Sequence, residues 1–370
     1  MNIVYDHQIF AMQEYGGISR YYYEIANRIA AMGNEVEIFS PFYVNKYFCN
    51  DSTILPWGLK IPRFPKYIRV IPNIINQTLS HLLIKNMRNV DIFHDTYYST
   101  FDSRPQPAKR VITVHDMIHE KFPQYFPRRD TTRKYKALAV QRAHHIICVS
   151  ENTRRDLIEI LNVPQENTSV VYHGYSISCA IDSVKPIIHE KPFILYVGSR
   201  RGYKNFILLL RAFESSKLLR NEFSIICFGG GKVTAQEIKL LRSLNLPSDC
   251  VSYINGDDLV LASLYASAKA FIYPSLYEGF GIPPLEAMAF GCPVVCSNTS
   301  SIPEVVGDAA HLFDPTNTSD LSAAIEAVVY SSDYSVRLKS KGYERIKMFS
   351  WEKCADDTLG VYEKLLGMNR

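Results

Sequence analysis

The sequence predicts an α/β protein with two parallel sheets, one in each half of the chain. Short apolar runs bounded by turn residues alternate with longer stretches of helical periodicity, which is the pattern of parallel α/β layers. The chain has 370 residues, more than the roughly 250 to 300 at which single hydrophobic cores stop growing. At 47% hydrophobic and 21% charged residues the composition is that of an ordinary globular protein, so two folded domains are expected.

The first half is predicted to form a Rossmann-like domain over residues 1–175. The stretch SRYYYEIANRIAAMG (19–33) has helical periodicity and ends at Gly33, where a C-cap glycine is expected. Strands alternate with such helical stretches throughout this half. The predicted strands lie at residues 2–6, 35–40, 91–95, 110–116 and 145–150.

The second half is predicted to form another Rossmann-like domain, over residues 190–351. Periodicity fades between residues 177 and 192, which indicates a connection. Ligands of open α/β folds bind at the carboxyl ends of the strands, so a cleft between the two domains is the expected site. The predicted strands lie at residues 193–198, 223–230, 251–256, 269–275, 293–298 and 310–314.

Composition also restricts location and partners. The eight cysteines are scattered without C-x2-C pairs, as free thiols in a reducing cytoplasm would be. The N-terminal MNIVYDHQIF lacks a basic leader with an apolar core, and no apolar run approaches the roughly 18 residues of a membrane span. A net charge of +4 is too small to argue for a nucleic-acid partner. We therefore expect a cytoplasmic protein that is at most peripheral to the membrane and binds no nucleic acid.

The segment from Trp57 to Arg88 lies in a stretch without acidic residues, between Asp51 and Asp91. Its cations alternate with aromatic and aliphatic residues, the composition of a surface that docks on anionic lipid at the inner face of a membrane. Alternatively, the apolar residues pack into the domain core and the cations form an ordinary solvated face. The sequence leaves both open.

The stretch YPSLYEGFGIPPLEAMAFGCPVV (273–295) holds two glutamates, Glu278 and Glu286, separated by seven residues. Two prolines suit the first turn of a short helix, and the glycines allow backbone N–H groups to approach a ligand closely. A helix N-terminus favours an anion, so this segment can hold a phosphate beside two carboxylates. The plainer alternative is a shaped turn with a first-turn acid favoured by the helix dipole.

At this point the sequence resembles a known family. The run YEGFGIPPLEAMAFGCPVVCSNTSSIPEVVGDAAHLFDP resembles the signature of the retaining family 4 glycosyltransferases of the GT-B fold, and the resemblance extends over nearly the whole chain. It is closest to bacterial enzymes that build surface polysaccharides, including a mannosyltransferase-like branch. The other similar segments are QEYGGISRYYYEIA (13–26), TVHD (113–116), HHIICVSENTRRDL (144–157), YVGSRRGYKNF (196–206) and FSWEKCADDTLGVYEKLL (349–366).

The resemblance implies two facing Rossmann-like domains, with residues 352–370 crossing back onto the first. It places Glu286 on the ribose hydroxyls of a nucleotide-sugar donor and Glu278 on the hydroxyls of the donor sugar, as a catalytic residue. Backbone N–H groups of Phe280, Gly281 and Ile282 are implied to face the donor. Retention of anomeric configuration is also implied.

A nucleotide-sugar donor leaves as a nucleoside diphosphate, whose developing charge is best met by preorganised cations. Arg200 and Lys204 follow a predicted strand and suit this role, because Arg grips phosphate oxygens in a fork and Lys supplies a point charge. Arg201 is the neighbour that could replace Arg200. The alternative is a solvated basic turn.

In the first domain the resemblance points to Gly16, Gly17 and His115. The two glycines would let a loop approach the diphosphate or the acceptor, although alone they are only a flexible turn. His115 would hydrogen-bond the donor hexose as a second catalytic residue, with Asp116 orienting the acceptor or the loop, although a histidine at a strand end is often structural. His94 and Asp95 repeat the pattern on the preceding strand and rank lower.

These residues predict a hexosyltransferase that uses a nucleotide-diphospho-sugar, with UDP-glucose favoured and GDP-mannose next. The acceptor is expected to be a glycan or a lipid-linked oligosaccharide. We expect neither a metal site nor a cofactor, because Arg200, Lys204 and the helix N-terminus can do the work of a divalent ion. The alternatives are a nucleotide-sugar epimerase of similar fold, a pyridoxal-phosphate-dependent glycan phosphorylase, and a non-catalytic nucleotide-sugar-binding protein.

Overall fold

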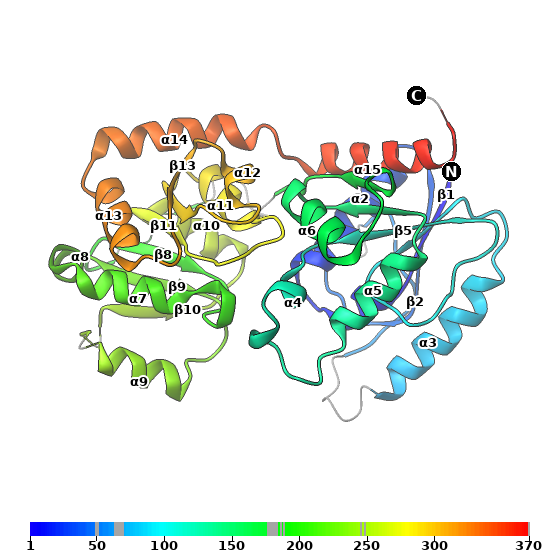
Figure 1. Cartoon of the computed structure of the whole chain (residues 1–370), viewed down its shortest axis with the longest axis horizontal. Helices are drawn as coiled ribbons and strands as arrows, with labels where there is room; N and C mark the ends of the chain where they lie inside the picture. The colour runs from blue at the N-terminus through cyan, green and yellow to red at the C-terminus, as the bar shows by residue number, and fades with distance from the viewer. Residues whose placement is uncertain are drawn as a thin grey trace. The chain divides into compact units, whose positions relative to one another are not determined.

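The computed structural model describes residues 1–48, 52–62, 70–175, 184–185, 187, 189–244, 246–247 and 249–368. The chain divides into two compact units, each built around one parallel sheet (Figure 1). Unit 1 comprises Met1–Gly174 together with Trp351–Arg370, and unit 2 comprises Tyr175–Ser350. Two parallel α/β sheets, one in each half of the chain, confirm the predicted fold class.

The sheet of unit 1 has seven parallel strands in the order β3-β2-β1-β4-β5-β6-β7. Its central strands are buried on both faces, which explains their continuous apolar runs. The sequence did not predict two edge strands. All four residues of one are exposed, and the other is only three residues long, so neither has a buried apolar pattern. The strands are β1 (Asn2–Tyr5), β2 (Glu35–Tyr43), β3 (Trp57–Lys60), β4 (Ile92–Asp95), β5 (Lys109–Val114), β6 (His145–Cys148) and β7 (Thr168–Val170).

Helix α15 (Trp351–Leu365) packs against α2 (Gly17–Ala31) within unit 1 (Figure 1). Its Tyr362 hydroxyl lies 3.1 Å from the hydroxyl of Tyr5 and 2.5 Å from Nδ1 of His94. The last helix therefore completes the core formed by the first strands. The remaining helices are α1 (Gln8–Met12), α3 (Val70–Lys85), α4 (Ile118–Lys121), α5 (Thr132–Arg142) and α6 (Glu151–Leu161), with 3-10 turns at Pro123–Tyr125 and Gln165–Asn167.

The sheet of unit 2 has six parallel strands in the order β10-β9-β8-β11-β12-β13. They are β8 (Phe193–Val197), β9 (Ser224–Phe228), β10 (Val251–Ile254), β11 (Ala270–Tyr273), β12 (Val294–Ser297) and β13 (Ala310–Phe313). The helices are α7 (Phe206–Ser215), α8 (Lys217–Glu222), α9 (Ala235–Ser243), α10 (Asp258–Ser267), α11 (Ile282–Ala289), α12 (Ile302–Val306), α13 (Thr318–Val329) and α14 (Ser332–Ile346), with a 3-10 turn at Gly202–Lys204.

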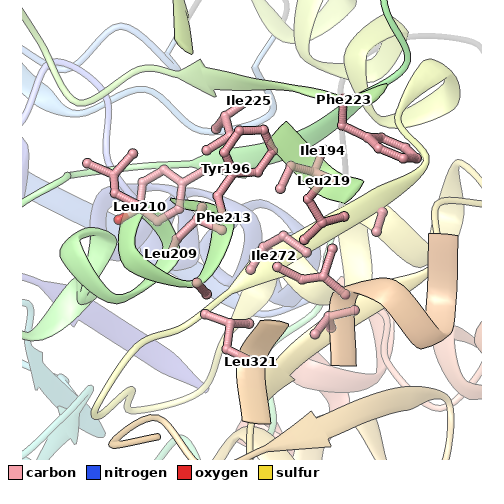
Figure 2. Close-up of a cluster of buried hydrophobic side chains, with 14 of the residues drawn as sticks. Ile194, Tyr196, Leu209, Leu210, Phe213, Leu219, Phe223, Ile225, Ile272 and Leu321 are labelled. Atoms are coloured by element: carbon pink, nitrogen blue, oxygen red, sulfur yellow. The ribbon is translucent and has the colours of Figure 1, made fainter. Parts of the chain in front are cut away.

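Figure 2 shows the core on one face of this second sheet. Leu209 and Phe213 of α7 pack with Ile194, Ile225 and other strand residues, and all are fully buried. Each such side chain stabilises the fold by about 1.5–3 kcal/mol relative to an exposed one. This packing holds the strands in place within the sheet, and the candidate residues lie at the carboxyl ends of these strands.

Both sheets have a point where the strand order reverses. In unit 1, β1 lies between β2 and β4, and in unit 2, β8 lies between β9 and β11. The loops that leave the carboxyl ends of two such neighbouring strands diverge to opposite faces of the sheet, which opens a crevice for ligands.

The cysteines and the helices add two further findings. Cys148, Cys227, Cys250, Cys292, Cys296 and Cys354 are buried free thiols, whereas Cys49 and Cys179 lie outside the described residues. Within the described part of the chain, every helix is too short or too polar to serve as a membrane span.

Candidate active site

The strand reversal of unit 2 brings together Lys204, which follows β8, and Glu278, which follows β11. The Lys204 ammonium lies 2.7 Å from Oε1 of Glu278, and the two side chains are 20% and 9% exposed. The rings of Tyr203 and Tyr273 lie 5.4 and 5.5 Å from the same ammonium. Because an ammonium has three N–H donors, Lys204 can hold Glu278 and still reach a phosphate oxygen.

Helix α11 begins beside this pair. Gly281 is its N-cap residue, with φ at +107° and no side-chain cap, a conformation that favours glycine. Pro283 and Pro284 have no N–H, so Gly281 and Ile282 provide backbone donors at this end of the helix. The helix dipole adds partial positive charge here. This end of α11 is therefore suited to an anion.

Two serines that the sequence analysis did not identify hold the loop in front of α11. Oγ of Ser300 accepts a hydrogen bond from the backbone N–H of Glu278 at 3.0 Å. Oγ of Ser301 lies 2.9 Å from the carbonyl oxygens of both Glu278 and Phe280. The Phe280 ring is itself buried against Phe349, at 5.7 Å between centroids. The loop geometry is thus fixed by protein contacts.

The second glutamate, Glu286, lies one turn into α11 and is 9% exposed. Its Oε2 is 3.4 Å from the hydroxyl of Tyr265 on α10. Burial, followed by the charge of Glu286, raises the pKa of Tyr265 well above its usual value, so this hydroxyl remains a donor. Glu286 thus lies on the predicted short helix, and its carboxylate is largely buried.

Arg200 is placed differently from the expectation. Its side chain is 2% exposed, and its Nε donates to Oε1 of Glu237 at 2.6 Å. Its two terminal nitrogens donate to the carbonyl oxygens of Gly229 and Gly231 at 2.7 and 3.0 Å, and the guanidinium lies over the ring of Tyr253. In this structure the guanidinium fork grips the glycine turn after β9. A contact of Arg200 with a donor phosphate stays a prediction.

The carboxylate that receives Arg200 also caps α9. Glu237 accepts hydrogen bonds from the backbone and side chain of Thr234, which completes a capping box. Burial raises the pKa of Glu237, but these hydrogen bonds and Arg200 outweigh it and hold the pKa below its usual value. Arg201, by contrast, is exposed. It is accessible to a ligand beside the partly exposed Lys204.

In unit 1, His115 follows β5 at the carboxyl edge of the sheet. Its Nε2 is buried and has no hydrogen-bond partner among the described residues. The ring lies parallel to His173 at 5.5 Å and edge-on to Tyr21 at 5.1 Å. Burial, with smaller effects of His94 and Lys136, lowers its pKa to about 3. A neutral imidazole with one unused nitrogen suits a sugar hydroxyl, and the catalytic role of His115 stays a prediction.

His7, which the sequence analysis did not single out, resembles His115 in its setting. It follows β1, is 9% exposed, and its Nδ1 is buried without a partner in the described part of the chain. Burial lowers its pKa, although the neighbouring Asp6 opposes this. Because β4 pairs with both β1 and β5, the two histidines lie at the same sheet edge, near the strand reversal. The sequence signal that could have identified His7 was its position directly after the first predicted strand.

The two glycines before α2 differ in their surroundings. A Cβ on Gly16 would lie 2.2 Å from Oε1 of Gln13, whereas a Cβ on Gly17 would meet nothing within 4 Å. That Gln13 oxygen accepts the backbone N–H of Ser19 at 3.2 Å and so stabilises the start of α2. A side chain at position 16 would therefore displace the Gln13 amide that supports α2, and ligand contacts of either glycine stay predictions.

The lower-ranked residues prove structural. His94 bonds to Tyr362 and, through Nε2, to Thr113 at 3.0 Å, so it belongs to the core. Asp95 pairs with Arg110 at 3.1 Å. The described residues contain no group of three or more His, Cys, Asp or Glu side chains that could hold a metal ion.

The class of protein follows from the two sheets and from comparison with solved structures. The fold matches sucrose-phosphate synthase from Thermosynechococcus elongatus with a TM-score of 0.75, at 20% identity over 99% of this chain and 98% of that one. It matches Anabaena HepE in complex with UDP-glucose with a TM-score of 0.71, at 16% identity over 98% and 100% of the two chains. These are GT-B folds, and so is this one.

The sequence comparisons define the family. Residues 15–178 match Glycosyltransferase Family 4, and residues 180–345 match Glycosyl transferases group 1. The O-antigen chain mannosyltransferase B of Escherichia coli is 28% identical, over 94% of this chain and 96% of its own length. The O-antigen chain mannosyltransferase RfbU of Salmonella typhimurium is 28% identical over 62% and 64%. The chain belongs to the family 4 glycosyltransferases, so it is an enzyme of the transferase class, and the predicted resemblance is confirmed.

Proposed function

We propose that this enzyme transfers a mannosyl residue from GDP-mannose, with retention of configuration, to a growing bacterial surface polysaccharide. The observation that carries the proposal is the Lys204–Glu278 pair beside the N-terminus of α11, at the strand reversal of unit 2. It combines a cation and a helix dipole for a diphosphate with a carboxylate for sugar hydroxyls.

The chemistry of the leaving group requires this combination. When the sugar–phosphate bond breaks, negative charge grows on the diphosphate, and fixed cations and N–H dipoles stabilise it without reorganisation. Lys204 and the backbone donors of Gly281 and Ile282 are the groups of unit 2 best placed for this. Arg201 is the accessible arginine beside them. These groups replace a divalent ion in the proposal, so the reaction needs no metal.

The two glutamates recognise the uncharged parts of the donor. A carboxylate accepts hydrogen bonds from vicinal hydroxyls, and Glu286 is proposed to take those of the ribose and Glu278 those of the hexose. The fixed backbone of the loop held by Ser300 and Ser301 supports this assignment, because a positioned acceptor discriminates between hydroxyl orientations.

Retention is proposed without an enzymic nucleophile. In retaining glycosidases a carboxylate attacks the sugar. Here Glu278 is paired with Lys204, which reduces its nucleophilicity. We propose instead that the acceptor hydroxyl attacks the face that the diphosphate leaves, and that its proton passes to a departing phosphate oxygen. A sugar-binding role of the neutral His115 ring stays a separate proposal for unit 1.

The donor and acceptor rest on the relatives. UDP-glucose was favoured on the sequence alone, but the two sequence relatives named above are O-antigen chain mannosyltransferases, which supports GDP-mannose and a glycan or lipid-linked acceptor. The epimerase alternative is not favoured, because the family matches are to transferases.

Thermal stabilisation by nucleotides tests the donor site. A ligand at a hundred times its Kd adds about 2.7 kcal/mol. For a unit of this size that corresponds to a rise in Tm of roughly 5–11 °C. We expect GDP and GDP-mannose to stabilise the protein, Glu286→Ala to abolish the effect, and the exposed control Glu344→Ala to retain it.

The outcomes separate the parts of the proposal. Selective stabilisation by UDP would overturn the donor but leave the transferase site standing. If no nucleotide raised the Tm, the proposed site itself would be wrong. For retention, the anomeric configuration of the product is read by NMR, and a β-mannosyl product from an α-linked donor would refute it.

A further inference from the structure

We propose that the surface formed by β3 and the outer side of α3 docks on a lipid bilayer that carries anionic headgroups. The surface is defined by described residues only, from Leu55 to Lys60 and from Ile74 to Arg88. It lies within unit 1, where α3 runs beside β2 at the margin of the unit (Figure 1).

The first observation is a concentration of exposed apolar side chains on both elements. Isolated exposed apolar residues are normal, but a contiguous group marks an interaction site. The exposed fractions are 53% for Leu55, 53% for Trp57, 67% for Leu59, 57% for Ile74, 39% for Ile75, 54% for Leu82 and 41% for Leu83.

The two elements present these residues on neighbouring parts of one sheet face. Ile84 of α3 is buried in a cluster with Phe39 of β2. The Trp57 ring stacks on that same Phe39, with centroids 4.4 Å apart and an interplanar angle of 11°. Trp57 therefore lies on the face of the sheet that α3 covers, and its other side is open.

Helical geometry places the aliphatic residues of α3 outward. At 100° per residue, Ile74, Ile75, Leu82 and Leu83 spread over about half of the circumference. Asn76, Ser80 and Ile84 lie on the opposite side and are buried. Asn76 fixes this orientation, because its amide exchanges two hydrogen bonds of 2.8 Å with the backbone of Phe42. The apolar stripe of α3 therefore cannot turn inward.

Charge identifies the partner. The defined surface, residues 55–60 and 74–88, contains Lys60, Lys85 and Arg88 and no Asp or Glu, whereas the average acid content of the chain, 37 in 370, would give about two. Lys85 and Arg88 are exposed beside the apolar stripe. An apolar stripe flanked by cations, with a tryptophan at its edge, fits the boundary between anionic headgroups and acyl chains.

A second copy of the chain fits this surface less well. In a symmetric dimer the same patch meets itself, so its cations would face cations without an acid to compensate within the patch. The docking surface is independent of the proposed function, because it can be measured without donor or acceptor.

The test is cosedimentation of the full chain with vesicles of phosphatidylcholine alone or with a quarter of phosphatidylglycerol. We expect at least tenfold tighter binding to the anionic vesicles at low salt, and most of that preference to disappear at high salt. Lys85→Gln with Arg88→Gln should weaken anionic binding by about 25-fold, at roughly fivefold for each cation. Leu82→Ser with Leu83→Ser should weaken it by about tenfold or more.

Matched controls come from exposed positions of unit 2. Ile238→Ser with Val336→Ser, and Arg211→Gln with Lys217→Gln, should bind as the unchanged protein does. Unchanged melting temperatures show that each variant is folded. The proposal is overturned by equal binding to both vesicles, by no binding, by equal losses in the controls, or by a dimer in sedimentation that the α3 substitutions dissociate. Nucleotide stabilisation that persists in the α3 variants separates this surface from the donor site.

Discussion

Replacing Arg200 by methionine tests whether this arginine holds the protein or the ligand. The side chain is 2% exposed and makes three hydrogen bonds, one to Glu237 and two to the carbonyls of Gly229 and Gly231. Methionine fills similar space but leaves a carboxylate without its counter-charge. Removing one partner of a buried pair costs about 3–5 kcal/mol. Because Glu237 is 12% exposed, water compensates in part, and we expect about 3 kcal/mol.

The assay is thermal unfolding. Hydrogen exchange of the β9 amides is measured as well, because it reports on unit 2. A loss of about 3 kcal/mol lowers the Tm of a unit of this size by roughly 6–12 °C. The neighbouring Arg201→Met is the control, because an exposed substitution changes stability by about 0.5 kcal/mol or less. If Arg200→Met melted like the unchanged protein while nucleotide stabilisation disappeared, the guanidinium would belong to the ligand, and the reasoning would be refuted.

Four further predictions concern charge. Lys204→Met should destabilise unit 2 by about 1–3 kcal/mol, with partial recovery in the double variant with Glu278→Gln; strictly additive urea-unfolding energies would contradict the coupling. The depressed pKa of Glu237 contributes stability that is present above about 4.5 and lost as pH falls through the folded pKa, so Glu237→Gln should flatten acid unfolding, and an unchanged acid limb would exclude this contribution. His115, with a pKa of about 3, contributes stability that is present above 6.5 and lost as pH falls towards 3; its ring should be neutral by NMR at pH 5, and a protonated ring would show that burial does not control it. Activity should persist in excess chelator, and loss of activity that magnesium restores would contradict metal independence.

The sheet could be predicted because its central strands are buried on both faces. Such strands need continuous apolar runs between turn residues, and FILYV of β8 is one example. Strand β3 failed this criterion because all four of its residues are exposed. Its pairing is determined by β2, which the local sequence cannot show. Gly33, with φ at +86° just after α2, is a local signal and was predicted correctly.

The sequence could predict the site residues that are recognisable from their residue type and from their position at the end of a predicted strand. Lys204 and Glu278 each follow a strand, and the strand order then brings them together. The partner of Arg200 could not be foreseen, because Glu237 lies 37 residues further along and serves α9 as well. The unpaired Nδ1 of His7 could not be foreseen either, because it depends on which side chains the neighbouring segments place beside it.

The return of α15 to unit 1 has a consequence for biosynthesis. Residues 175–350 separate the helix from the rest of the unit that it completes. At 5–20 residues per second a ribosome needs roughly 10–35 s to translate that interval. During this time unit 2 can fold as an uninterrupted segment, while the surface around Tyr5 and His94 waits for Tyr362. The nascent chain therefore carries an uncovered aromatic surface through about half of its elongation, until its last helix leaves the exit tunnel.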